Sequence, residues 1–314
     1  MRTLACLSLL AACGESSSAT ALFALPGDTT DFYSLPFPND LRREADGTID
    51  LSAFPTNSLI ADKYRQAADS LDGFGLNGAV FARFDGTLDH PSLPDPAGSV
   101  AEGASVYLVN VDPDSLGRSS RVPILVRFRA EKTQTMLENH LIARPYPGFG
   151  LAEGTTYALV ITKRVGGVKA SPVFEALMGT GGDAKTIDAR AVYEPLLAYL
   201  DEPGGDERDD VVSAAVFTTQ RATQIVPALR KAVFDAPAPT ASNVVAGTAT
   251  PALTIFTGSY TAPNFQSGDV PYRDAPAGQI MVAGDSAVVQ RMEAMRFGLS
   301  VPAGAVPANG FPIA

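Results

Sequence analysis

Histidine and cysteine are scarce in this sequence, with two of each among 314 residues. So few side chains leave little material for zinc sites, disulfide frameworks or several histidine-based catalytic centres. Clusters of positive charge are also missing, because 24 lysines and arginines stand against 34 aspartates and glutamates, for a net charge of −10. Proteins that bind nucleic acid neutralise phosphates with Lys and Arg, so we expect no nucleic-acid partner. We also expect no cofactor and no bound metal.

Apolar and turn-forming residues are abundant instead. Hydrophobic residues make up 46% of the chain and charged residues 18%, which is typical of a globular protein. The length is ample for a buried core. The 28 glycines and 24 prolines favour a strand-rich fold with many turns over a helical bundle.

The N-terminus has the pattern of an export signal. Arg2 precedes an apolar run over residues 4–10, which is too short to cross a bilayer as a helix. The run closes on Leu10-Ala11-Ala12-Cys13, which resembles the bacterial lipobox, where the cysteine is acylated after the preceding peptide is cut. We therefore predict a signal peptide over residues 1–13, a lipid anchor at Cys13 and a flexible tether over residues 14–30. The alternative is a plain secretory signal with an incidental cysteine.

The predicted anchor makes the membrane a partner of the protein. Acyl chains contribute about 0.8 kcal/mol per buried CH₂, so two or three chains on Cys13 would hold the protein firmly. Gly14 follows Cys13 where an aspartate would signal retention in the inner membrane. By the same resemblance, this favours the bacterial outer membrane or cell surface.

Short segments with alternating polarity predict a mainly β fold. Over residues 122–129, the apolar side chains of Ile124, Val126 and Phe128 share one face, as expected of a half-buried strand. Further strands are expected at residues 78–84, 105–111, 151–162 and 211–219, and then near residues 252–257, 278–282 and 295–301. Turn signals separate these segments, and this spacing predicts a β-sandwich.

Two helical stretches interrupt the strands. Asp188 is the expected cap of a helix whose apolar stripe runs to Leu200, with Pro195 at a kink or near its start. A second apolar stripe predicts a helix over residues 221–235. We therefore expect an N-terminal extended segment and sandwich over residues 31–220, that helix, and a last region over residues 236–314.

Several segments resemble, in order, the N-terminal region of bacterial virulence-factor lipases and related secreted lipoprotein hydrolases. The first covers residues 32–50, which contain Leu-Pro-Phe-Pro-Asn-Asp-Leu and Asp-Gly-Thr-Ile-Asp. The others are residues 78–84, 148–162, 216–220, 265–272 and 299–302. The resemblance covers nearly all of the expected mature chain, and it implies that the sandwich is an immunoglobulin-like (Ig-like) module.

In such proteins an α/β-hydrolase domain follows, with a His-Gly-rich oxyanion loop and a G-x-S-x-G nucleophile elbow. The resemblance implies that residues 236–314 form a linker and the incomplete start of that domain. Residues 311–314 would then begin its next strand, so we interpret the chain as truncated before the catalytic domain. None of the family's catalytic residues falls within the sequence, and we predict no catalytic residue and no turnover.

Two functions remain open at this point. The first is the non-catalytic anchoring and display region of a surface lipoprotein esterase or lipase. The alternative is a stand-alone Ig-like surface lipoprotein that binds a polymer or protein partner. An enzyme in its own right would need a nucleophile and a base. The nearest match to an elbow, around Ser286, lacks the second glycine, and His90 and His140 are expected at the surface.

Three further motifs are interpreted as structural. Residues 73–78 match G-x-G-x-x-G, but a strand is expected after them where a dinucleotide site needs a helix. Residues 179–186 come one residue short of a phosphate-binding loop, and the acidic run over residues 201–210 lacks the spacing of a calcium loop. Four aromatic residues are expected in the sandwich core, with a ligand groove as the alternative: Phe32, Tyr33, Phe37 and Tyr107.

Overall fold

The computed structural model describes residues 19–69, 71–88, 92–133, 136–203, 205–273 and 277–311. The chain divides into unit 1, which ends at Arg221, and unit 2, which begins at Ala222. Within the described residues the fold is mainly β, as predicted, with several sheets and four α-helices. The predicted signal peptide with Cys13, His90 and residues 312–314 lie outside the described residues.

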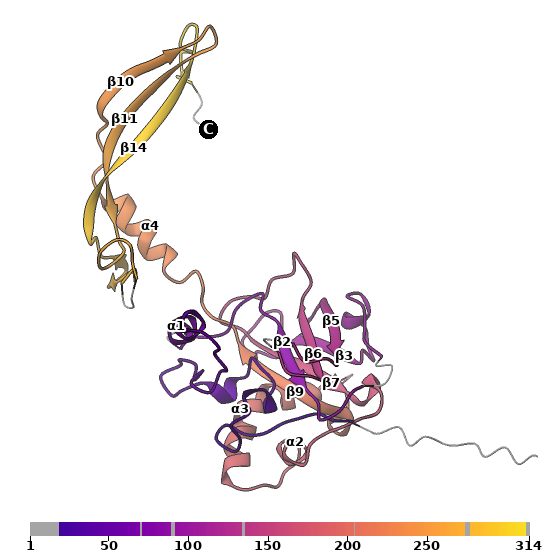
Figure 1. Cartoon of the computed structure of the whole chain (residues 1–314). Coiled ribbons are helices and arrows are strands. Elements are labelled where there is room, and N and C mark those ends of the chain that lie inside the picture. The colour runs from indigo at the N-terminus through magenta and orange to yellow at the C-terminus, as the bar shows by residue number, and fades with distance from the viewer. Residues whose placement is uncertain are drawn as a thin grey trace, which may run out of the picture. The chain divides into compact units, whose positions relative to one another are not determined.

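Two antiparallel sheets form the centre of unit 1 (Figure 1). The smaller sheet has the strand order β2-β6-β5 and the larger one the order β4-β3-β7-β9. Their strands are β2 (Val80–Arg83), β3 (Val106–Asn110), β4 (Arg121–Val122), β5 (Ile124–Arg129), β6 (His140–Pro145), β7 (Thr156–Thr162) and β9 (Val211–Thr218). Apolar side chains from both sheets, among them Ala82, Leu141 and Leu159, form one shared core.

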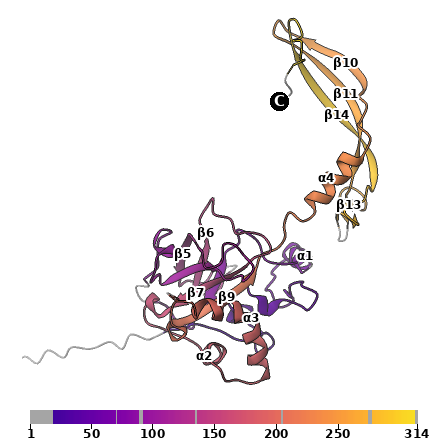
Figure 2. The ribbon, with the colours of Figure 1, turned by 180° about the vertical axis from the view of Figure 1, so that it is seen from behind.

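A helical layer covers the other face of the larger sheet. Helices α2 (Pro172–Met178) and α3 (Ala184–Leu200) lie beside β9 in both ribbon views (Figures 1 and 2). Their side chains, such as Phe174 and Leu196, form a second core with Val109 and Val160 of the sheet. Strands β3 and β7 are therefore covered on both faces, which explains why their sequences are almost continuously apolar.

Local capping decides where α3 begins. The Asp183 carboxylate accepts a hydrogen bond from the backbone N–H of Thr186 at 2.8 Å, so the helix starts at Ala184. The prediction of Asp188 as the cap is therefore wrong, and Pro195 lies inside the helix. Two helices lacked a predicted counterpart: α2 and α1 (Leu59–Ala68), which Ser58 caps.

The chain from Ala19 onward is packed against unit 1. Strand β1 (Ala19–Thr20) pairs in parallel with β8 (Val168–Lys169). Ala21 is 0% exposed and Phe23 is 4% exposed. The flexible tether predicted over residues 14–30 is therefore wrong for residues 19–25. The physical reason is a period of two, which turns every second side chain of this segment into the core.

Unit 2 is built around three long strands in the order β10-β11-β14. These are β10 (Ser242–Ala249), β11 (Leu253–Asn264) and β14 (Arg291–Pro302). Helix α4 (Val226–Asp235) packs through Ala228 and Ala232 on a small hairpin, β12 (Val282–Ala283) and β13 (Ser286–Ala287). The expected strands near residues 252–257 and 295–301 are thus present and longer than predicted, whereas residues 278–281 form no strand.

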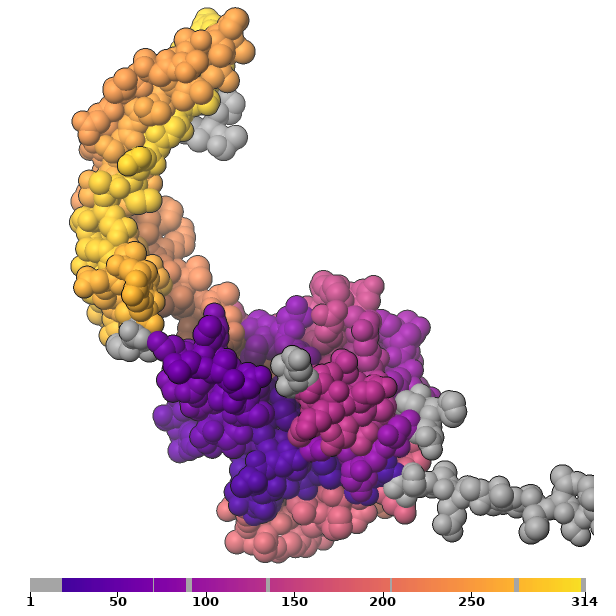
Figure 3. All heavy atoms as spheres, viewed as in Figure 1, coloured from indigo at the N-terminus to yellow at the C-terminus, as the bar shows by residue number. Residues whose placement is uncertain are grey.

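One face of this long sheet is apolar and remains exposed. Directly paired residues of neighbouring strands share a face, which places Phe256 with Leu299 and Tyr260 with Met295. Phe297 lies over Gly258, where a Cβ would come within 2.5 Å of its ring. Met295 is 41% and Leu299 51% exposed. Among the described residues of unit 2 no second layer covers the end of the sheet remote from α4 (Figures 1 and 3).

Candidate functional site: an aromatic cavity in unit 1

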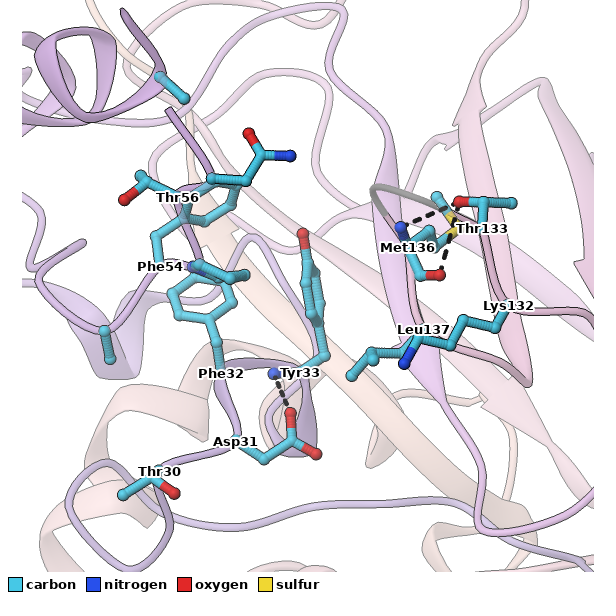
Figure 4. A pocket seen from close by; sticks show the side chains of 14 residues that line it. Thr30, Asp31, Phe32, Tyr33, Phe54, Thr56, Lys132, Thr133, Met136 and Leu137 are labelled. Atoms are coloured by element: carbon cyan, nitrogen blue, oxygen red, sulfur yellow. Dashed lines mark hydrogen bonds between the residues drawn. The ribbon is translucent and has the colours of Figure 1, made fainter. Parts of the chain in front are cut away.

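A cavity of about 460 Å³ opens in unit 1 between three segments of chain (Figure 4). Residues 30–33 form one side, and residues 53–57 with Ala61 of α1 form the next. The third side comes from the loop between β5 and β6, through residues 132–133 and 136–137. Its volume lies in the range of about 300–1,000 Å³ that is typical of small-molecule sites.

Three aromatic rings form the apolar wall of the cavity. The ring of Phe32 lies 5.2 Å from that of Tyr33 and 5.0 Å from that of Phe54, both edge to face. Figure 4 shows the three rings grouped on one side, opposite Met136 and Leu137. Phe32 is only 3% exposed, because the Arg42 guanidinium also lies 3.9 Å from its ring centre. Contacts of this kind hold the wall in one arrangement.

Asp31 fixes the turn that presents these rings. Its Oδ1 accepts a hydrogen bond from the backbone N–H of Tyr33 at 3.1 Å, which caps the short 3-10 helix η1 (Phe32–Ser34). Its Oδ2 accepts a hydrogen bond from Nη1 of Arg83 at 2.5 Å. One carboxylate therefore shapes the turn and attaches it to β2 through an ion pair with Arg83.

Arg83 holds both sides of the cavity from behind. Besides Asp31, it donates from Nη2 to Oε1 of Glu138 at 2.9 Å and from Nε to the Glu138 carbonyl at 3.3 Å. Glu138 follows the loop that carries Met136 and Leu137. A single guanidinium thus links the aromatic wall to the loop opposite it, and its side chain is only 14% exposed.

His140 lies behind the aromatic wall and is fully buried, so the prediction of a surface histidine is wrong. Its ring is 5.1 Å from that of Tyr33, and Nδ1 is 2.9 Å from the Leu137 carbonyl. Nε2 has no hydrogen-bond partner among the described residues. Burial lowers the pKa of His140 and raises the pKa of Tyr33, so both side chains are held neutral.

The exposed edge of the cavity is polar. Thr56, Asn57 and Lys132 contribute to it, and Figure 4 shows Lys132 extending beside Leu137. Thr133 closes the loop, because its Oγ1 accepts from the backbone N–H of Met136 at 3.0 Å. The arrangement therefore offers an apolar, aromatic interior with a cationic side chain at its margin, which suits binding of an apolar ligand.

The other predicted aromatic residues lie in the cores. Phe37 packs against Phe32 and Phe74, with ring centres 5.1 and 5.7 Å apart. Tyr107 is fully buried in the four-stranded sheet, and burial raises its pKa. The core interpretation therefore holds for Phe37 and Tyr107, whereas Phe32 and Tyr33 both pack and line a cavity. Phe54 also lines the cavity, but it lies in a loop, where alternation of polarity in the sequence gives no signal.

The glycine motifs have structural explanations. A Cβ on Gly73 would lie 2.6 Å from the backbone nitrogen of Gln220, so this glycine allows two backbone segments to meet. Strand β2 follows residues 73–78, as expected. The Arg190 guanidinium of α3 donates to the carbonyls of Ala176 and Leu177 in α2 at 2.7 and 3.0 Å. The same guanidinium donates to the carbonyl of Gly181, which holds the loop between α2 and α3 in place.

Arginines neutralise much of the acidic run. The ion pairs are Arg208 with Asp201 at 2.5 Å, Arg118 with Glu202 at 2.8 Å and Arg164 with Asp206 at 2.7 Å. Over the described ranges no cluster of three or more His, Cys, Asp or Glu side chains is arranged to hold a metal ion. Ser286 lies in the β12–β13 hairpin of unit 2 and His140 in unit 1.

No protein-family model, curated protein or solved structure matches the chain. In the part that the structure describes, every helix is too short or too polar to span a membrane.

Proposed function

We propose that this chain is the non-catalytic anchoring and display region of a surface lipoprotein that hydrolyses esters. In this proposal Cys13 carries the lipid anchor, unit 1 is an Ig-like display module, and unit 2 supplies the leading strands of a hydrolase domain. The protein would then be located at the bacterial outer membrane or cell surface. The basis for the enzyme class is the resemblance of residues 32–50 and the later segments to secreted lipoprotein hydrolases.

The exposed apolar face of unit 2 is the observation that carries this proposal. Phe256, Tyr260, Phe297 and Leu299 share that face, and three strands with one apolar side gain stability when another layer covers it. Exposed apolar patches of this kind are typical of surfaces that meet a partner. The leading strands of a hydrolase domain would turn such a face toward the rest of that domain.

Unit 1 supports the display role by its packing. It has two cores, one between its sheets and one under its helices, and the first includes Phe84 and Phe217 at 1% exposure each. Such a unit needs no further layer, so it can stand between an anchor and a second domain.

Antibodies against unit 1 provide the experiment. We expect them to recover from cell envelopes a polypeptide that is longer than this chain, incorporates labelled palmitate and hydrolyses p-nitrophenyl butyrate. The 314-residue chain alone should hydrolyse none. Recovery of an envelope protein of this length that lacks hydrolase activity would contradict the proposal.

The second candidate is a stand-alone surface lipoprotein that binds a ligand. The aromatic cavity of unit 1 favours it, because fixed rings around about 460 Å³ of space are typical of a binding site. The same envelope experiment separates the candidates, since a stand-alone binder would be recovered at the length of this chain.

A further inference from the structure

We propose that the aromatic cavity binds the hydrocarbon chain of a single-chain amphiphile with a carboxylate head, such as a medium-chain fatty acid. This assignment goes beyond the proposed function and does not depend on it. The cavity belongs to unit 1 alone, and its lining suggests both parts of the ligand.

The interior suits an alkyl chain. The rings of Phe32, Tyr33 and Phe54 face the side chains of Met136 and Leu137, so a ligand would meet carbon and sulfur over most of its length (Figure 4). The rings are held by edge-to-face contacts at 5.0 and 5.2 Å, and by the Asp31 cap of η1. A preformed apolar site of this kind binds its ligand without the entropic cost of ordering its own walls.

The charges at the margin suit an anionic head. Asp31 and Lys132 are the charged side chains of the lining. Arg83 donates to Asp31 at 2.5 Å and to Glu138 at 2.9 Å, so its guanidinium is shared by two carboxylates. Lys132 is the cationic side chain of the lining, and its charge also acts on the nearby Glu138 carboxylate, whose pKa it helps to lower. A carboxylate would interact with Lys132 while its chain enters the cavity.

Helix α1 extends the apolar surface next to the cavity. Ala61 of this helix lines the cavity, and Leu59, Ile60 and Tyr64 are 76%, 69% and 75% exposed. Large apolar side chains at such exposure on one helix are unusual for a face that meets only water. Of these three, Tyr64 follows Ala61 by three positions and therefore lies on the same side of the helix.

The absence of tryptophan from the chain allows a site-specific test. Phe54→Trp places a single tryptophan in the cavity wall. Phe149→Trp places one at a site that is 50% exposed in unit 1, and Phe297→Trp places one on the apolar sheet of unit 2. Each variant is titrated with octanoate, decanoate and dodecanoate below their micelle concentrations. Displacement of a fluorescent fatty acid from the unmodified chain measures the same affinities without altering the wall.

We expect a saturable blue shift of the tryptophan emission in Phe54→Trp, at one ligand per chain, and none in Phe149→Trp. Phe297→Trp, on the exposed apolar sheet, should show no saturation at one ligand per chain. Each added methylene should tighten binding by about fourfold until the cavity is full. Lys132→Ala should weaken carboxylate binding by up to about fivefold and leave the matching alcohol unaffected. Lys169→Ala, at an exposed lysine outside the cavity, should change neither.

Three results would overturn the assignment. The first is no saturable binding of dodecanoate by either Phe54→Trp or the unmodified chain. The second is an affinity that does not change with chain length. The third is equal binding of the alcohol and the carboxylate together with no effect of Lys132→Ala, since the head would then not lie at this lysine.

Discussion

Replacing Tyr193 with phenylalanine removes one buried oxygen that joins three parts of unit 1. The Tyr193 hydroxyl donates to the carbonyl of Ala214 in β9 at 2.9 Å and accepts from Nδ2 of Asn39 at 2.7 Å. Tyr193 and Asn39 are both 0% exposed, so water does not replace the lost partner. Asn39 belongs to the N-terminal segment that continues from the aromatic wall of the cavity.

The size of the effect follows from these two bonds. A buried polar group that loses its partner costs about 1–3 kcal/mol, and here the Asn39 amide and the Ala214 carbonyl each lose one bond. We expect Tyr193→Phe to lower the free energy of unfolding of unit 1 by about 2 kcal/mol. With a urea dependence of about 2 kcal/mol per M, the midpoint should fall by roughly 1 M.

The assay is urea unfolding followed by far-UV circular dichroism, with amide hydrogen exchange in β7 and β9 assigning the transition to unit 1. Tyr64→Phe is the matched control, because Tyr64 is 75% exposed and its change should stay within about 0.5 kcal/mol. Asn39→Leu should cost less in the Tyr193→Phe chain than in the original one. A loss below about 0.5 kcal/mol for Tyr193→Phe would refute the argument from two buried hydrogen bonds.

Three further predictions concern other parts of the chain. Burial lowers the pKa of His140 in the folded state, so as the pH falls the imidazole becomes protonated in the unfolded state before it does in the folded one. Unit 1 should therefore lose stability as the pH falls below about 6.5. Between about pH 7 and 5.5, His140→Phe should lose less stability than the original chain, as measured by urea unfolding. An equal pH dependence of stability in the two chains would contradict this prediction. Gly73→Ala should lower the thermal midpoint of unit 1 by several degrees. Gly75→Ala should not, because its Cβ would lie 4.0 Å from the backbone nitrogen of Gly78, an ordinary contact distance. Leu299→Lys should reduce binding of the dye 1-anilinonaphthalene-8-sulfonate without altering unfolding of unit 1, because Leu299 is 51% exposed on the apolar sheet.

Sequence alternation predicted the strands well where one or both faces of a strand are covered. Residues 122–129 are an example, since Ile124 is 0% exposed and Arg127 and Arg129 are exposed in β5. Alternation failed for His140, because the segment that carries Tyr33 covers the outer face of β6 at that point. A contact between residues so distant in sequence leaves no local pattern.

The cavity could be predicted only in part. From the sequence, a ligand groove is only the alternative to a place in the sandwich core for Phe32 and Tyr33, as it is for Phe37 and Tyr107. Phe54 lies in one loop, and Met136 and Leu137 lie in another. Ring contacts with Phe32 hold the first loop, and the ion pairs of Arg83 with Asp31 and Glu138 link the second to the aromatic wall. Tertiary ion pairs of this kind have no signature in a single sequence.

The nucleotide sequence downstream of codon 314 tests the central claim most directly. If unit 2 supplies the leading strands of a hydrolase domain, the open frame continues into a His-Gly-rich loop and a G-x-S-x-G elbow. A stop codon with no hydrolase in frame would contradict that claim, and the aromatic cavity of unit 1 would then be the functional site of a binding lipoprotein.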